Sequence, residues 1–356
     1  MLRLSFQATL PDLSVFQHDE NFRPAIALIN DWYAGATSFT FYSSGSTGTP
    51  KPIVLSKTFL ITSAQRTIEL FGITSSDRLL LALNTSFIGG MMMVVRAMVA
   101  QCELVYLPPP HINRSNFLAL PAIKLASLVP AQVQTLLQEH THDPFLQIKN
   151  LLLGGASLNK SLEEKLIALK SNCRFFHTYG MTETASHVAI RTIQDENSAY
   201  QSLDGFEFSQ DKRGCLIIHH IKNPLFTLAT NDVIRLFTPH TFEWIGRADW
   251  VVNSGGIKFN LEKAEECVAD FLHQNRLNNA FTSYKCPDEK WGEKWVLILS
   301  GTLNQNLSEP LKAFCQKVLG KYIYPKDILN TKKIVYLSNG KVDRFNSYLE
   351  ATRPSI

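Results

Sequence analysis

The stretch YSSGSTGTPK occupies residues 42–51 and directly follows the alternating run TSFTFYS at 37–43. The alternation predicts a strand, and the glycines with a proline predict a loop at its end. Hydroxyls, glycine amides and a lysine in one loop are groups that bind anionic oxygens. The order is not that of a Walker A loop, which needs glycine where Pro50 stands. We therefore predict a phosphate-binding loop rather than a Ser/Gly surface turn, built from Ser43, Ser44, Gly45, Ser46, Thr47, Gly48 and Lys51.

Beyond this loop, short apolar runs alternate with amphipathic stretches. The strand-like runs are 78–83, 103–108, 123–129, 150–155 and 173–180, and the helical patterns are 56–72, 88–100, the stretch after Pro130, and 157–170. This alternation predicts a mostly parallel sheet covered by helices, in which ligands gather at the carboxyl ends of the strands.

From about residue 200 the pattern changes to strand-like pieces separated by turn residues, which predicts a smaller β-rich subdomain. A boundary between Ala248 and Asp249 is expected. After it, helices at 261–274 and 308–319 and strands at 294–301 and 333–337 predict an α+β unit. The predicted fold class is α/β, with a large domain over 1–248 and a small mobile C-terminal domain over 249–356.

Composition excludes several classes of protein. The 356 residues are 45% hydrophobic and 19% charged, which excludes a disordered or fibrous chain. A net charge of +4 is too small to indicate a nucleic-acid partner. The six cysteines form no CxxC pair, so no zinc site or disulfide framework is predicted. With no stretch typical of a leader or membrane span, we expect an untargeted cytoplasmic protein.

The phosphate loop and four later motifs, taken in order, resemble the adenylate-forming superfamily of acyl-CoA ligases, luciferases and peptide-synthetase adenylation domains. The later motifs are YGMTET (179–184), LATNDVIRL (228–236), IGRADWVVNSGGIKF (245–259) and SNGKVDR (338–344). The resemblance implies an AMP-forming ligase that uses ATP, Mg²⁺ and CoA.

In the first of these motifs the resemblance implies that Tyr179 packs on adenine, Thr182 contacts the α-phosphate and Glu183 holds Mg²⁺, with Thr47 as a further metal contact. A carboxylate beside a triphosphate is tolerable only when a cation intervenes, so this pairing is chemically coherent. Taken alone, Glu183 would be interpreted as a solvated helix-cap carboxylate. The remaining residues that the resemblance assigns to the nucleotide site are Gly155, Ala156, Gly180 and Met181.

The later motifs imply further roles. Asp232 would bind the ribose hydroxyls, although Asn231 replaces the usual glycine before it, and Arg247 would also reach the ribose. Asp249 would be the pivot between domains. Lys341 would be the catalytic ammonium that bridges the substrate carboxylate and the α-phosphate, and it lowers the repulsion between these two anions. The residues assigned to CoA are Ser254, Gly255, Gly256 and Lys258.

Within the superfamily, the middle of the chain looks most like the o-succinylbenzoate–CoA ligases of menaquinone biosynthesis. The similar runs are SFIGGMMMVVRAM (86–98), ASLVPAQVQTLL (126–137), LLLGGASL (151–158) and YGMTETASH (179–187). An arginine in an apolar helix needs an anionic partner. The resemblance implies that Arg96 meets the succinyl carboxylate of the substrate, whereas the alternative is an ion pair with a local acid. The other residues assigned to the acyl group are Phe87, Gly154 and Ser186.

The chain departs from the superfamily in length, because the phosphate loop begins at residue 42 and a preceding region is short. Two interpretations stay open: a compact lineage, or a homodimer in which a second copy covers the exposed flank. We favour the homodimer. Two other functions also stay open, namely a ligase for another aryl or fatty acid or for a carrier protein, and a non-catalytic nucleotide-binding relative.

Overall fold

The computed structural model describes residues 1–7, 9–42, 51–137, 143–193, 199–277, 279–301, 305–336 and 342–353. By its internal contacts the chain divides into two compact units, Met1–Phe206 and Glu207–Ile356. The predicted domain boundary between Ala248 and Asp249 lies inside the second unit and stays a prediction.

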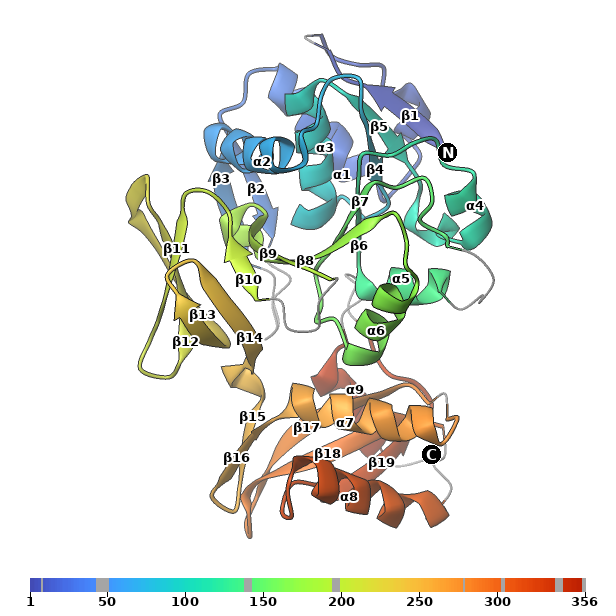
Figure 1. Ribbon diagram of the computed structural model, residues 1–356, viewed down its shortest axis with the longest axis vertical. Helices are drawn as coiled ribbons and strands as arrows, with labels where there is room; N and C mark the ends of the chain where they lie inside the picture. The colour runs from blue at the N-terminus through green and yellow to red at the C-terminus, as the bar shows by residue number, and fades with distance from the viewer. Residues whose placement is uncertain are drawn as a thin grey trace. The chain divides into compact units, whose positions relative to one another are not determined.

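The first unit is built on a mixed sheet whose centre is parallel (Figure 1). Four neighbouring pairs, β5–β4, β4–β6, β6–β7 and β7–β8, run parallel, while the pairs β1–β5, β8–β9 and β9–β10 run antiparallel. The strands in sheet order are β1 (Leu2–Ser5), β5 (Glu103–Tyr106), β4 (Arg78–Leu81), β6 (Leu125–Leu128), β7 (Asn150–Leu153), β8 (Arg174–Gly180), β9 (His187–Thr192) and β10 (Tyr200–Ser202).

Helices cover both faces of this sheet and form two hydrophobic cores with it. One core gathers residues of α1 (Arg23–Tyr33), α2 (Lys57–Phe71), α3 (Ile88–Ala100) and the hairpin β2–β3 (Ser38–Tyr42, Pro52–Ser56). The other gathers residues of α4 (Arg114–Leu118), α5 (Pro130–Leu136) and α6 (Lys160–Ala168). The central strands β6 and β7 are mostly apolar, and each of their residues is buried, as expected for strands covered on both faces.

Local sequence sets the ends of the helices that matter for the site. The Ser56 hydroxyl accepts a hydrogen bond from the Phe59 amide at 3.1 Å and begins α2, and Gly72 ends it in the left-handed region with φ +55°. Phe87 precedes α3 in extended backbone, and the helix ends at Gln101, again left-handed. None of the described helices combines the length and apolar character that a membrane span requires.

The second unit holds two sheets. The first contains neighbouring strands β11 (Phe206–Gln210), β12 (Cys215–His220), β13 (Asn223–Thr238) and β14 (Thr241–Arg247). After the short helix η4 (Ala248–Trp250), the second contains β16 (Ile257–Asn260), β15 (Val251–Ser254), β18 (Gly292–Ser300) and β17 (Phe281–Asp288), with β19 (Asp327–Thr331) parallel to β18. Helices α7 (Leu261–Gln274) and α8 (Gln305–Leu319) share one core, and α9 (Arg344–Thr352) packs in the other.

The predicted alternation and the α/β class are confirmed, and α7 has the predicted bounds. One prediction is wrong: the segment 333–337 is not a terminal strand where the structure describes it, since Tyr336 makes only an isolated bridge with Val342. The last strand of that sheet is instead β19, a largely polar segment that the hydrophobic pattern does not reveal.

Candidate active site

The carboxyl end of β7 continues into Gly154, Gly155 and Ala156. A Cβ on Gly154 would lie 2.5 Å from the Thr178 hydroxyl oxygen of β8, and Gly155 has φ +80°, so glycine is required at both positions. The carbonyl of Ala156 lies 3.1 Å from Nε2 of His177, and Nδ1 of that histidine lies 2.6 Å from the Tyr200 hydroxyl. Burial lowers the pKa of His177 to about 4, so this turn is anchored on a neutral imidazole.

The carboxyl end of β8 carries the YGMTET motif in a tight turn. A Cβ on Gly180 would lie 2.3 Å from the Ser186 carbonyl oxygen and 2.5 Å from the His187 Cα, so the two ends of the turn touch through backbone. The Thr184 hydroxyl accepts from the Met181 amide at 3.0 Å and donates to the Ser186 carbonyl at 2.7 Å. The turn closes at Ala185 with φ +62°. These contacts hold 181–186 in one shape at the edge where ligands of parallel sheets bind.

Three side chains of this turn were predicted to touch ATP or its metal. Tyr179 makes an edge-on contact with Tyr200, with ring centroids 6.0 Å apart. Thr182 is buried, and Glu183 is partly exposed on the short helix η3 (Thr182–Thr184). Within the described part of the chain Glu183 makes no hydrogen bond or ion pair. Its carboxylate is therefore available to a cation.

Arg96 lies in α3 at 2% exposure, and it reaches the end of the YGMTET turn. One terminal nitrogen donates to the Ser186 hydroxyl and lies 3.4 Å from Nδ1 of His187, and the other lies 3.5 Å from the Met93 sulfur. Its Nε is buried without a partner, and no carboxylate among the described residues pairs with it. Burial lowers the pKa of Arg96 to about 9, so the guanidinium stays charged at neutral pH.

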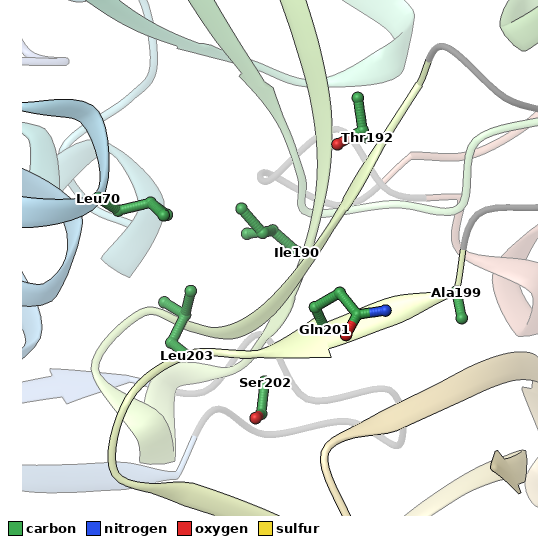
Figure 2. A pocket seen from close by; sticks show the side chains of 7 residues that line it. All are labelled: Leu70, Ile190, Thr192, Ala199, Gln201, Ser202 and Leu203. Carbon is green, nitrogen blue, oxygen red and sulfur yellow. The ribbon is translucent and has the colours of Figure 1, made fainter. Parts of the chain in front are cut away.

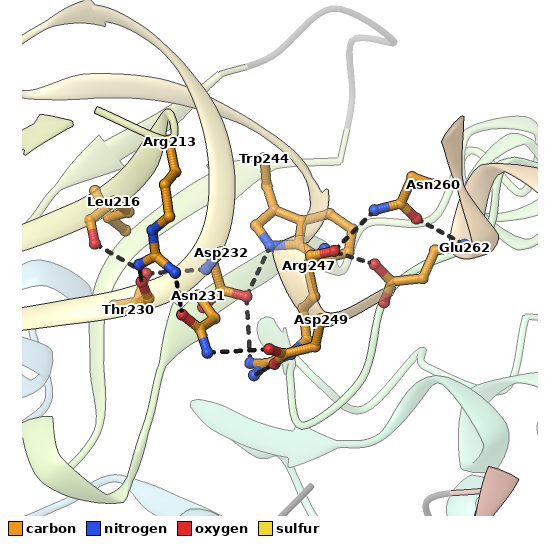
Figure 3. Close-up of polar contacts among 10 residues, drawn as sticks. All are labelled: Arg213, Leu216, Thr230, Asn231, Asp232, Trp244, Arg247, Asp249, Asn260 and Glu262. Atoms are coloured by element: carbon orange, nitrogen blue, oxygen red, sulfur yellow. Dashed lines mark hydrogen bonds and ion pairs between the residues drawn. The ribbon is translucent and has the colours of Figure 1, made fainter. Parts of the chain in front are cut away.

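The second unit holds a separate polar network around Arg247 (Figure 3). Its guanidinium lies 2.5 Å from Asp249 and 3.5 Å from Asp232, and the Trp244 indole donates to Asp232 at 3.4 Å. The backbone of Arg247 is held by Glu262, which accepts from its amide at 2.9 Å. Burial opposes the charge of Arg247, but the contacts with both aspartates raise its pKa above the ordinary value. The predicted ribose residues and the predicted hinge therefore form one connected group.

Asn231, the departure from the family pattern, has a role of its own. It lies in strand β13 and not in a turn, so a glycine is not required there. Its amide nitrogen donates to Asp249 at 3.1 Å, and its oxygen accepts from Arg213 at 3.1 Å. The substitution thus adds a second link between the segment around Asp232 and the predicted hinge.

The predicted CoA residues lie on the hairpin β15–β16. Gly255 and Gly256 have φ +60° and +83°, and the Gly255 amide donates to the Trp291 carbonyl at 2.7 Å. The Ser254 hydroxyl is buried and has no hydrogen-bond partner among the residues that the structure describes, whereas Lys258 is exposed.

Two further predicted residues flank regular elements of the first unit. Lys51 is exposed at the start of β3, and Phe87 is half-buried before α3. The phosphate-loop residues Ser43–Gly48 and the predicted catalytic Lys341 lie outside the described residues.

A pocket of about 370 Å³ opens elsewhere in the first unit (Figure 2). Its walls come from the end of α2, from β9 and from the segment around β10, and none of the predicted site residues lines it. The lining residues are Leu70, Ile190, Thr192, Ala199, Gln201, Ser202 and Leu203. The lining side chains that the structure describes are all uncharged.

Residues 15–206 match the family described as AMP-binding enzyme, which is more than half of the chain. The chain belongs to the AMP-binding enzyme family. An acyl-CoA synthetase (AMP-forming)/AMP-acid ligase II-like protein from Dyadobacter fermentans is 32% identical, with 94% of this chain and 95% of that chain covered and a TM-score of 0.56. The predicted resemblance to adenylate-forming enzymes is thereby confirmed.

Two further relatives of this AMP-binding enzyme are longer than it. A 2-succinylbenzoate–CoA ligase from Listeria monocytogenes is 23% identical, with 89% of this chain and 71% of the relative covered. The o-succinylbenzoate CoA synthetase from Bacillus subtilis, solved with its acyl-adenylate intermediate, is 21% identical with a TM-score of 0.74, and 89% of this chain and 70% of that chain are covered. The fold of the AMP-binding enzyme is therefore that of these ligases.

The sequence did not predict four residues that support the contacts of Arg96 and, separately, the network of Arg247. His187 and Thr67 extend the contacts of Arg96, and Arg213 and Glu262 extend the network of Arg247. A histidine directly after Ser186, followed by the apolar run 188–190, was the one signal available for the first pair.

Proposed function

We propose that this AMP-binding enzyme is an ATP-dependent acid–thiol ligase that converts o-succinylbenzoate, ATP and CoA to o-succinylbenzoyl-CoA, AMP and pyrophosphate through an acyl adenylate. The observation that carries the substrate is Arg96, a buried guanidinium whose partners among the described residues are all neutral.

A buried cation without a counter-ion is costly, and it persists where a ligand supplies the missing charge. The local acid that would give Arg96 a purely structural role is absent from the described residues. o-Succinylbenzoate carries two carboxylates, so one is activated while the other stays anionic. The anionic one is the partner we propose for Arg96, with Ser186, Gly154 and Phe87 around the acyl group.

The turn at 179–186 and the glycines after β7 are proposed to hold the nucleotide, with Tyr179 on adenine and Thr182 on the α-phosphate. The donor set fits Mg²⁺, which usually takes one or two carboxylates together with phosphate oxygens and water. Glu183 has no competing partner, and no group of three or more His, Cys, Asp or Glu side chains that would form a protein-only site occurs among the described residues. A bound Mg²⁺ would neutralise developing phosphate charge.

For the second unit we propose that Asp232 and Arg247 bind the ribose and that Asp249 is the hinge. The ion pair of Arg247 with both aspartates supports a common site, and the position of Asp249 in η4 between two sheets supports a pivot. The unpartnered Ser254 hydroxyl, with Gly255, Gly256 and Lys258, is proposed to meet CoA after a domain rotation that withdraws Lys341.

Lys341→Ala is expected to lower the rate of adenylation about 100-fold or more, because the ammonium that separates two anions is lost. Thioester formation from a supplied acyl adenylate should stay near the wild-type rate. Single-turnover measurements of the two half-reactions check this, and an equal loss of both would contradict the division of labour.

Arg96→Ala is expected to raise the KM for o-succinylbenzoate about 10- to 100-fold, since a charge-assisted contact is lost, while the KM for ATP changes little. Steady-state kinetics with each substrate varied in turn test this. Arg235→Ala, which removes an arginine with 66% side-chain exposure, is the control and should leave both values unchanged. Unchanged values in Arg96→Ala would return that residue to a structural role.

We further propose a homodimer in the cytoplasm. Large apolar side chains of the first unit are exposed, including Val15, Val54 and Leu70, and all six cysteines are free thiols, as a reducing compartment favours. Light scattering at micromolar concentration should report twice the chain mass of 40.1 kDa, and a single-chain mass would contradict the dimer.

A further inference from the structure

The guanidinium of Arg96 stands at one end of a hydrogen-bonded series that crosses from α3 through β9 to α2. Arg96 donates to the Ser186 hydroxyl, which lies 3.1 Å from Nδ1 of His187. Nε2 of His187 lies 3.4 Å from the Thr67 hydroxyl, and that hydroxyl lies 3.5 Å from the Ser63 carbonyl. Apart from Ser186, the residues of this series are buried.

The direction of the hydrogen bonds determines the state of His187. A guanidinium has only donors, so the Ser186 oxygen accepts from Arg96 and its own proton points to Nδ1 of His187. Nδ1 is therefore an acceptor, and the imidazole proton sits on Nε2 and faces Thr67. The Thr67 hydroxyl in turn donates to the Ser63 carbonyl. Each of these hydrogen bonds has one donor and one acceptor only when His187 is neutral in this tautomer.

The electrostatic surroundings favour the same state. The charged groups that face His187 are Arg96 from α3 and Arg66 from α2, and both are cations. Burial, together with these two arginines, holds the pKa of His187 well below its ordinary value. A neutral imidazole leaves the positive charge of Arg96 uncancelled, whereas a carboxylate at position 187 would neutralise it.

We infer that His187 is a positioning residue of the carboxylate site: as the neutral Nε2–H tautomer it orients Ser186 and Arg96 toward the unreacted carboxylate of a dicarboxylic substrate. The identity of the substrate in this inference rests on the proposed function. The geometry of the hydrogen-bonded series is independent of it. Ser186, which follows Arg96 in the series, is half-buried, and Thr67 contacts His187 from the other side.

The test compares His187→Ala, His187→Gln and Thr67→Val with the wild type. Substrates are o-succinylbenzoate and two monocarboxylic analogues, 2-butyrylbenzoate and 3-benzoylpropionate, each of which lacks one carboxylate. His187→Ala should raise the KM for o-succinylbenzoate about tenfold with little change in kcat. The analogue that is turned over lacks the carboxylate that would meet Arg96. Its KM should therefore be the same in His187→Ala as in the wild type. His187→Gln keeps an acceptor and a donor and should restore the KM to within about threefold.

A second measurement is independent of turnover. In two-bond ¹H–¹⁵N spectra of protein with labelled histidine, the resonances lost in His187→Gln identify His187 among the ten histidines. They should show the neutral Nε2–H tautomer from pH 8 down to pH 6, and Arg96→Ala should shift them. A charged ring or the Nδ1–H tautomer would overturn the inference, as would an equal rise in KM for all substrates. If the wild type does not turn over o-succinylbenzoate, the proposed function fails, and these spectra still decide the state of His187.

Discussion

Gly180→Ala is expected to destabilise the protein by about 2–3 kcal/mol and to lower ligase activity about 100-fold or more. The added Cβ would stand 2.3 Å from the Ser186 carbonyl oxygen and 2.5 Å from the His187 Cα. Both neighbours are backbone, so the clash is relieved only by moving the turn that carries Thr182, Glu183 and Ser186. The substitution therefore disturbs the proposed metal and acyl contacts together.

The matched control is Gly89→Ala, on a helix of the same unit. A Cβ there would meet only the end of the Leu83 side chain, at an ordinary distance of 3.6 Å. Since alanine favours a helix more than glycine does, its stability should be unchanged or raised by up to about 1 kcal/mol. Urea unfolding followed by circular dichroism measures both variants. A Gly180→Ala protein as stable and active as the wild type would show that 181–186 is not held as described.

Arg344→Ala is expected to destabilise the second unit by about 2–3 kcal/mol, because it leaves the partly buried Glu265 carboxylate, 19% exposed, without its ion-pair partner. The two guanidinium nitrogens of Arg344 contact both oxygens of Glu265 on α7, one of them at 2.5 Å. One nitrogen also donates to the Ser283 carbonyl at 2.9 Å, and the guanidinium lies 4.8 Å from the ring centre of Trp250. Arg344, the last residue of the lysine motif, thus contacts both α7 and Trp250, the residue after the predicted hinge.

The control for this variant lies directly after the same helix. Arg353 pairs with Glu350, but its side chain is 73% exposed against 13% for Arg344. Arg353→Ala should change the free energy of unfolding by less than about 1 kcal/mol, since exposed pairs contribute little. Thermal and urea unfolding of both variants provide the comparison, and equal effects would contradict a special role for the buried pair. Arg344→Ala should also slow adenylation more than thioester formation, because Lys341 precedes it by three residues.

Much of the fold was predictable because local patterns and tertiary structure agree. Helix α7 has an apolar face at helical spacing and Asn260 at its N-cap, so its bounds follow from sequence. Strand β19 was missed because it is mostly polar and gains its order from parallel pairing with β18. Helix α9 was missed because nine residues with few buried positions give a weak pattern.

In the candidate site, too, some features were predictable from the sequence and others were not. The motif residues were found because their order along the chain is distinctive, but their contacts were not. Thr67 and His187 are 120 residues apart, and no pattern within either segment predicts that they meet. Asn231 was noted only as a departure, and its link to Asp249 follows from strand geometry. The residues that hold other residues in place could therefore be identified only from the structure.

This AMP-binding enzyme is proposed to join o-succinylbenzoate to CoA. The most direct test incubates the purified protein with o-succinylbenzoate, Mg-ATP and CoA, with benzoate, fatty-acid and no-acid controls, and identifies products by mass spectrometry. We expect equal amounts of AMP and o-succinylbenzoyl-CoA with the named acid alone. AMP formation with another acid would contradict the proposed substrate, and absence of turnover with every acid despite measurable ATP binding would contradict the ligase itself.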